Sequence, residues 1–258
     1  MNGLFAFHGV DSKTGVTMIS QSVAETIAKY KKEVKVMHVS LNGRFNTEYV
    51  DQVGESIEGI KMYLDNKILS KKDLLQSCKY TNNLFMLAGV ESPGQSRHYF
   101  PETANYLLDT MEDEFDIIIA DTGNDLDNGL AIGALQRISE RFCILTQQES
   151  MIKRYEKLEP LYNQLGLLFS IKIINQYSDQ DPYRLEYIAD RLNLCSDELI
   201  KVAKTGYGRQ AEMDYRTLLY YKDENYKKDI TQIADIILMK CNIDPIQKQR
   251  KKKWKLFI

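Results

Sequence analysis

The sequence predicts an α/β fold of the doubly wound type, with helices flanking a mostly parallel sheet. Two observations support this prediction. Short apolar runs alternate along the chain with longer segments of helical periodicity. Several runs, such as residues 117–120, are apolar at every position, as strands in the middle of a parallel sheet are. The 258 residues fit a single domain of this type.

The predicted elements follow one another as strand, helix, strand, so right-handed crossovers join neighbouring parallel strands. The strands are expected at residues 4–7, 34–39, 84–87, 117–120, 142–145 and 171–174. The helices are expected at about residues 17–31, 59–77, 101–111, 150–164, 182–194 and 229–240. We expect one domain over residues 1–244 and a distinct C-terminal tail over residues 245–258.

Charge is distributed unevenly along the chain. The tail holds six basic and no acidic residues after residue 247, which leaves 28 basic against 36 acidic residues in the body, a net charge of −8. An acidic body argues against a nucleic-acid partner. The four cysteines form no C-x-x-C pair, and no run of about 18 apolar residues occurs. These features predict a cytoplasmic protein without a disulfide framework.

The loop at residues 7–18 leads from the first strand into a helix, an arrangement that presents main-chain NH groups to phosphate. The usual phosphate-loop pattern is G-x-x-x-x-G-K-[ST]. Aligned on its second glycine, this chain keeps the glycine and the hydroxyl residue but has valine at the first glycine (Val10) and at the lysine. The predicted nucleotide-binding residues of this loop are Ser12, Lys13, Thr14, Gly15, Val16, Thr17 and Met18.

Two side chains near this loop each have two interpretations. Lys13 either points back toward the phosphates in place of the missing lysine or is solvated on the loop surface. Asp121 ends an apolar strand as a Walker B aspartate does, and with Thr17 it could hold Mg²⁺ through water ligands. Its alternative role is that of an ordinary polar residue at the start of a loop.

His8 and His38 each follow apolar strand residues and could face one cleft. Two histidines without a third ligand make a poor metal site, so we expect packing at the strand ends instead.

Four segments together resemble the MinD/ParA superfamily of deviant Walker ATPases, which are SIMIBI-type P-loop NTPases. Within it, the sequence is most similar to the CpaE/TadZ-like branch linked to tight-adherence pilus assembly. The resemblance covers most of residues 3–240, with the segments in the family's order and approximate spacing. They are Phe7–Ala24 (FHGVDSKTGVTMISQSVA), Phe115–Asn124 (FDIIIADTGN), Phe142–Ser150 (FCILTQQES) and Ile171–Tyr177 (IKIINQY).

The resemblance implies ATP and Mg²⁺ as cofactors and a homodimer that forms face to face through bound nucleotide. It also implies a positioning or assembly role, with cell-envelope assembly proteins, such as those of a pilus, as partners. Asn175 matches the position where the family contacts adenine; the alternative is a strand-end asparagine in a turn.

The chain departs from the family where hydrolysis needs support. In the alignment Asp11 stands at the signature lysine, and Ser40 and Asn42 stand where acidic residues position the attacking water. Since neither serine nor asparagine acts as a general base at neutral pH, we expect slow ATP hydrolysis or none and assign no catalytic residue. A nucleotide-independent pseudo-ATPase scaffold and a DNA-partition ATPase are the alternatives.

The tail combines cations with aromatic and aliphatic side chains, and many MinD-like proteins end in a short membrane-targeting helix. Basic residues are attracted to anionic lipid, and aromatic rings insert at the level of the headgroups. We therefore expect peripheral membrane contact through Lys251, Lys252, Lys253, Trp254, Lys255, Leu256 and Phe257. A solubilising disordered end and a contact with an acidic protein are the alternatives.

Overall fold

The structure is a computed structural model that describes all residues except 1–2, 45–48, 51–53, 93, 196–197 and 248–258. The described residues form one eight-stranded sheet in the order β3-β4-β2-β5-β1-β6-β7-β8, and all of its strand pairs are parallel. This confirms the predicted doubly wound fold. The strands are β1 (Gly3–Gly9), β2 (Val36–Ser40), β3 (Glu55–Ser56), β4 (Leu84–Ala88), β5 (Ile117–Asp121), β6 (Glu140–Thr146), β7 (Ile171–Tyr177) and β8 (Leu199–Ala203).

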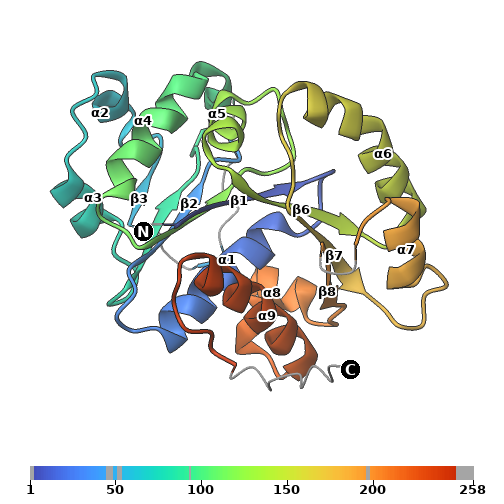
Figure 1. Cartoon of the computed structure of the whole chain (residues 1–258). Coiled ribbons are helices and arrows are strands. Elements are labelled where there is room, and N and C mark those ends of the chain that lie inside the picture. Colours follow the sequence, from blue (N-terminus) through green and yellow to red (C-terminus); the bar gives the residue numbers. More distant parts are fainter. Residues whose placement is uncertain (1–2, 45–48, 51–53, 93, 196–197, 248–258) are drawn as a thin grey trace, which may run out of the picture.

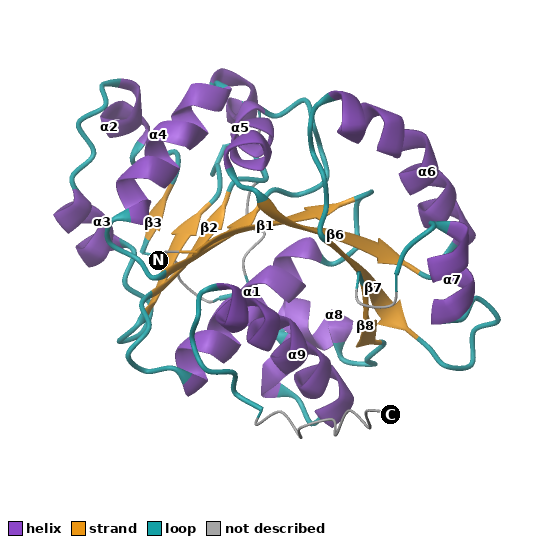
Figure 2. Ribbon diagram, viewed as in Figure 1, coloured by secondary structure: helices purple, strands orange, loops and turns teal. Residues whose placement is uncertain are grey.

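Helices cover both faces of this sheet (Figures 1 and 2). One face carries α1 (Val16–Tyr30), α8 (Gly208–Met213) and α9 (Glu224–Lys240), with the short helix η2 (Leu218–Tyr220). The other face carries α2 (Lys61–Asp65), α3 (Lys71–Ser77), α4 (Pro101–Glu112), α5 (Gly129–Arg137), α6 (Glu149–Gln164) and α7 (Leu185–Arg191). A short helix η1 (Gln95–His98) precedes α4. Each face therefore has its own buried apolar cluster.

The central strands are apolar on both sides because both faces of the sheet are covered. In β5, Ile118 packs in the cluster under α4 and α5, whereas Ile117 and Ile119 pack in the cluster under α1 and α9. All three side chains are fully buried. β1 lies between β5 and β6, so its carboxyl end, where the loop of residues 10–15 begins, is at the centre of the sheet.

Some elements differ from the sequence-based expectation. The helix expected over residues 59–77 is two helices, α2 and α3, because Lys67 adopts a positive φ of 53° and ends the first. The sequence did not predict α5, which contains Gly129 and Gly133. A Cβ at either glycine would collide with main-chain oxygen of Tyr99 or Pro101, so these glycines permit α5 to pack closely on α4. The strands β3 and β8 and the helix α8 were also not predicted.

The two histidines lie on opposite faces of the sheet, so they do not face one cleft. His8 is fully buried against Tyr162 and Phe169 on the α6 side. His38 is fully buried on the α1 side, where its Nε2 lies 3.0 Å from the hydroxyl oxygen of Ser20. The packing role expected for both is confirmed. Among the described residues no group of three or more His, Cys, Asp or Glu could hold a metal ion.

The described end of the chain is attached to α9. The main-chain NH groups of Ile246 and Gln247 donate to the carboxylate of Asp235, at 2.5 and 3.2 Å. The predicted membrane residues 251–257 lie outside the described residues, and the domain boundary at residues 244/245 stays a prediction. In the part of the chain that the structure describes, no helix is both long and apolar enough to cross a bilayer.

Burial of the two histidines makes stability depend on pH. Burial lowers the pKa of His8 and of His38 from 6.5 to about 4, so below pH 6.5 the unfolded chain binds protons that the folded chain excludes. We expect the free energy of unfolding to fall by about 2 kcal/mol per histidine between pH 7.5 and pH 5. His38→Gln should remove about half of that decrease in urea titrations at the two pH values. His98→Gln, at an exposed position, is the control, and an equal decrease in wild type and His38→Gln would contradict the assignment.

Candidate functional site

The loop between β1 and α1 is held in shape by its own main chain and by glycine. Gly9 closes β1, where a Cβ would collide with the side chain of Thr14. The hydroxyl of Thr14 donates to the carbonyl of Asp11 at 3.0 Å. Gly15 is the N-cap of α1 with φ of 86°, in the left-handed region that favours glycine. The loop therefore reaches the helix through a conformation that depends on Gly15.

The first turn of α1 presents main-chain donors. No described residue accepts a hydrogen bond from the NH groups of Gly15, Val16, Thr17 or Met18. The first NH groups of any helix lack partners within the helix, and they carry the positive end of the helix dipole. Such a turn binds phosphate or another anion through its backbone, without requiring a lysine side chain.

Asn175, from β7, lies under this loop. Its side-chain NH₂ donates to the carbonyl of Thr14 at 2.7 Å, and the residue is buried. A Cβ added to Gly15 would collide with the same amide group. The structure thus places Asn175 as a support for the loop, whereas the predicted contact with adenine stays a prediction.

Thr17 and Asp121 are brought together although they are 104 residues apart. The Thr17 hydroxyl donates to Oδ2 of Asp121 at 2.5 Å, and the side-chain NH₂ of Asn42 donates to the same oxygen at 3.0 Å. The NH of Gly123 donates to Oδ1 at 2.8 Å. These three donors hold the carboxylate in a fixed orientation, with Asp121 fully buried at the end of β5.

This donor set suits Mg²⁺, which prefers oxygen ligands. Because the Thr17 hydroxyl gives its proton to Asp121, its oxygen lone pairs remain available to a cation. Asp121 already accepts three hydrogen bonds, so it would orient Thr17 and the water ligands of the ion. The metal role of the pair stays a prediction.

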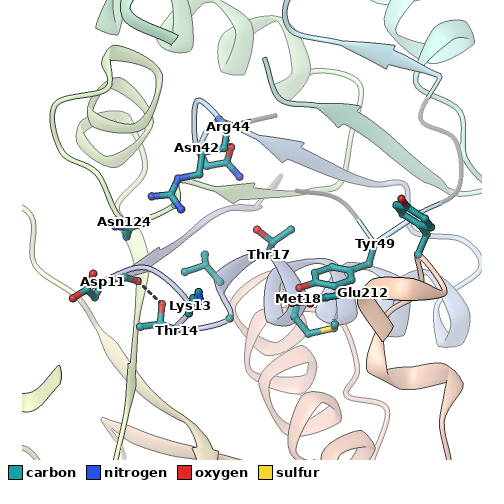
Figure 3. A pocket seen from close by; sticks show the side chains of 14 residues that line it. Asp11, Lys13, Thr14, Thr17, Met18, Asn42, Arg44, Tyr49, Asn124 and Glu212 are labelled. Carbon is teal, nitrogen blue, oxygen red and sulfur yellow. Dashed lines mark hydrogen bonds between the residues drawn. The ribbon is translucent and has the colours of Figure 1, made fainter. Parts of the chain in front are cut away.

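Thr17, Asn42 and Gly123, which each donate to the carboxylate of Asp121, border a cavity of about 330 Å³. Figure 3 shows the phosphate loop on one side, and Asn42 and Arg44 across the cavity from it. Most of the predicted loop residues line it, whereas Ser12 is exposed on the loop surface. The lining residues are Asp11, Lys13, Thr14, Gly15, Val16, Thr17, Met18, Asn42, Arg44, Tyr49, Gly123, Asn124, Glu212 and Tyr215.

The cations around the loop are arranged differently from the usual motif. Val16 is buried in the apolar cluster under α1 and α9, so the lysine position carries no charge. Lys13 is exposed and has a positive φ of 62°. Asp11 pairs with Arg154 of α6 at 3.3 Å, and the same guanidinium donates to the carbonyl of Val10 at 2.8 Å.

Several lining residues were not found from the sequence. Arg44 and Asn124 follow β2 and β5, and the positions after the carboxyl ends of parallel strands are the available signal for them. Tyr49 and Glu212 come from segments without a motif. The pKa of Tyr49 is raised to about 12, mainly by burial and to a smaller extent by the negative charges of Glu212 and Asp121. Its phenol therefore stays neutral at physiological pH. Gln21 holds Tyr49 in place through both of its main-chain polar groups.

Replacing Gly15 with alanine should cost more stability than a positive φ alone explains. Gly166 also has a positive φ, of 70°, but a Cβ there would meet nothing within 4 Å, so Gly166→Ala measures the backbone cost of about 1 kcal/mol. We expect Gly15→Ala to cost about 2 kcal/mol or more, because its Cβ also displaces Asn175. In an Asn175→Ala background this extra cost should disappear. Chemical denaturation measures all three effects, and equal losses for the two glycines would contradict the steric contact.

No family model and no curated protein matches this chain. Solved structures are similar to it. A ParA family ATPase from Chlorobium tepidum has a TM-score of 0.78 at 16% identity, covering 90% of this chain and 97% of that one. The septum site-determining protein MinD of Pyrococcus horikoshii, complexed with Mg-ADP, has a TM-score of 0.73 at 15% identity, covering 92% and 96%. A Cyanothece McdA variant complexed with ATP has a TM-score of 0.70 at 11% identity, covering 96% and 99%. At these identities the likeness shows the fold: the chain has the fold of the ParA/MinD-type P-loop ATPases.

Proposed function

We propose that this protein binds ATP with Mg²⁺ in the cavity between the phosphate loop and the segments that follow β2 and β5. One observation carries the proposal: the first turn of α1, including Thr17, lines the cavity, and the Thr17 hydroxyl is bound to the buried carboxylate of Asp121 directly behind it. Backbone donors suit the phosphates, and the hydroxyl and carboxylate oxygens suit the magnesium ion. The nucleotides in similar folds, Mg-ADP in MinD and ATP in McdA, support the same ligand here.

Hydrolysis is proposed to be slow or absent. Val16 provides no cation for the β and γ phosphates, and such cationic contacts stabilise the transition state of phosphoryl transfer. Asn42 uses its amide to orient Asp121, and no general base stands at Ser40 or Asn42. Binding is less affected than hydrolysis by these substitutions, because the main chain of the loop supplies much of the phosphate contact.

The biological role that follows is positioning or assembly of a cell-envelope machine, such as a tight-adherence pilus of the CpaE/TadZ-like kind. In this proposal nucleotide favours a homodimer, and the dimer presents two C-terminal tails to an anionic membrane surface. Two weak attachments on one particle raise the overall affinity steeply, so nucleotide state and location become linked. The acidic body disfavours the alternative of a DNA-partition ATPase.

Isothermal titration with ATP in the presence of Mg²⁺ tests the binding. We expect heat of binding for the wild-type chain and, for Thr17→Ala, a loss of affinity of about tenfold, since one charge-assisted oxygen contact to the ion is lost. Ser12→Ala keeps the main-chain NH of the loop and removes only a hydroxyl at an exposed position outside the cavity lining, so it should bind as wild type does. Chelation of Mg²⁺ should abolish the difference between wild type and Thr17→Ala.

If the wild-type chain gives neither heat nor a thermal shift at saturating nucleotide, the protein is a scaffold that does not depend on nucleotide. Light scattering of the same samples then shows whether a dimer forms without ATP.

Sedimentation with vesicles tests the tail. A chain that ends at Gln247 keeps the segment bound to Asp235 and lacks only the basic, aromatic end. We expect the full chain to sediment with anionic vesicles and the shortened chain to remain in the supernatant, because each basic residue near anionic lipid contributes about 1 kcal/mol. Neutral vesicles and high salt should reduce sedimentation of the full chain. Equal behaviour of the two chains on anionic vesicles would rule out the membrane role.

A further inference from the structure

Arg44 is connected to the predicted magnesium site through a chain of hydrogen bonds. The carboxylate of Asp121 accepts from Thr17 and from Asn42, and the side-chain oxygen of Asn42 accepts from the main-chain NH of Arg44 at 2.9 Å. Gly123 packs against Asn42, and a Cβ added to Gly123 would collide with the Cβ of Asn42. The main chain of Arg44 is therefore fixed relative to Thr17, in the first turn of α1.

Arg44 lines the cavity together with Asn42 and Asn124, across from the loop that carries Lys13 and Thr14 (Figure 3). Its Nη2 donates to Oδ2 of Asp125 at 2.9 Å, and both side chains of this pair are nearly half exposed, at 44% and 46%. An exposed ion pair is weak and exchanges easily for a better anion. A phosphate offers arginine a doubly charged partner with several acceptor oxygens, in a geometry that the planar guanidinium fits.

We propose that Arg44 leaves Asp125 on nucleotide binding and pairs with the terminal phosphate of ATP, supplying the charge that Val16 cannot. This inference rests on the proposed function. The NH groups of the first α1 turn would hold the inner phosphates, and the terminal phosphate would then reach the side of the cavity lined by Asn42 and Arg44, near Thr17. Arg44 therefore distinguishes a triphosphate from a diphosphate, and Asp125 competes with the triphosphate for it.

Two other cations near the loop fit this role less well. Lys13 is exposed on a left-handed turn, and its long side chain is held by no described partner. Arg154 does not line the cavity, because its guanidinium is bound to the carbonyl of Val10 and to Asp11. Arg154 thus serves as a matched control: it is another arginine in an ion pair beside the same loop.

Titration of the full chain with Mg-ATP and with Mg-ADP tests the proposal through the ratio of the two affinities. Arg44→Gln should weaken ATP binding about tenfold and change ADP binding less than about twofold, since only ATP carries the terminal phosphate. Asp125→Asn should have the opposite effect, tightening ATP binding about twofold to threefold because it frees Arg44. Arg154→Gln should leave the ratio of ATP to ADP affinity unchanged.

The outcomes separate this inference from the proposed function. If the wild-type chain binds neither nucleotide, both fail. If the wild-type chain binds both nucleotides but Arg44→Gln leaves the ratio of ATP to ADP affinity unchanged, Arg44 does not recognise the terminal phosphate. The same conclusion follows if Arg44→Gln weakens the binding of ATP and ADP alike. In both cases the proposed function, ATP binding, is retained. A folding defect would weaken both nucleotides in either variant, so the opposite signs expected for Arg44→Gln and Asp125→Asn exclude it.

Discussion

The hydrogen bond from Thr17 to Asp121 is the contact on which the arrangement of the site depends. It joins the first turn of α1 to the carboxyl end of β5, and it forms only if β1 and β5 are in the correct parallel register, with Phe7 opposite Asp121. A shift of one residue along either strand would turn Asp121 to the other face of the sheet. The apolar packing of both faces fixes that register, so the large buried clusters position a small polar site at their edge.

The sequence predicted the parts of the site that follow from short-range rules. A strand apolar on both faces and ending in Asp121, and a loop with Gly15 and Thr17 before a helix, are patterns with physical causes. The structure brings these residues together at the centre of the sheet. Arg44 had only the general signal of a position after a parallel strand, and Tyr49 and Glu212 had none, because they lie in segments without a motif and enter the cavity only through the tertiary fold. Glu212 also follows β8, an unpredicted strand.

Two other differences between expectation and structure have the same origin, namely packing between elements distant in sequence. Gly129 and Gly133 disfavour a helix by their intrinsic propensity, yet they belong to α5, where close contact with α4 outweighs that cost. His8 and His38 each lie near the end of an apolar run but face opposite sides of the sheet. Side chains alternate between the two faces along a strand, and the residue from which this alternation starts differs between β1 and β2. Local patterns identify elements, whereas the tertiary contacts decide their ends and faces.

The loop differs from the usual phosphate-loop pattern in side chains that would accelerate phosphoryl transfer, whereas it keeps the main-chain groups that would bind phosphate. Main-chain NH groups are present in any loop of this shape, so replacing lysine by Val16 removes charge without removing the donors. Phosphoryl transfer depends on cations placed against developing charge, and that support is what the loop has lost. In our proposal Arg44, an exposed arginine after β2, attracts a bound triphosphate but provides no base to activate water. If ATP binds as we propose, a site of this composition favours a bound state that persists, as a protein that signals by occupancy rather than by turnover requires.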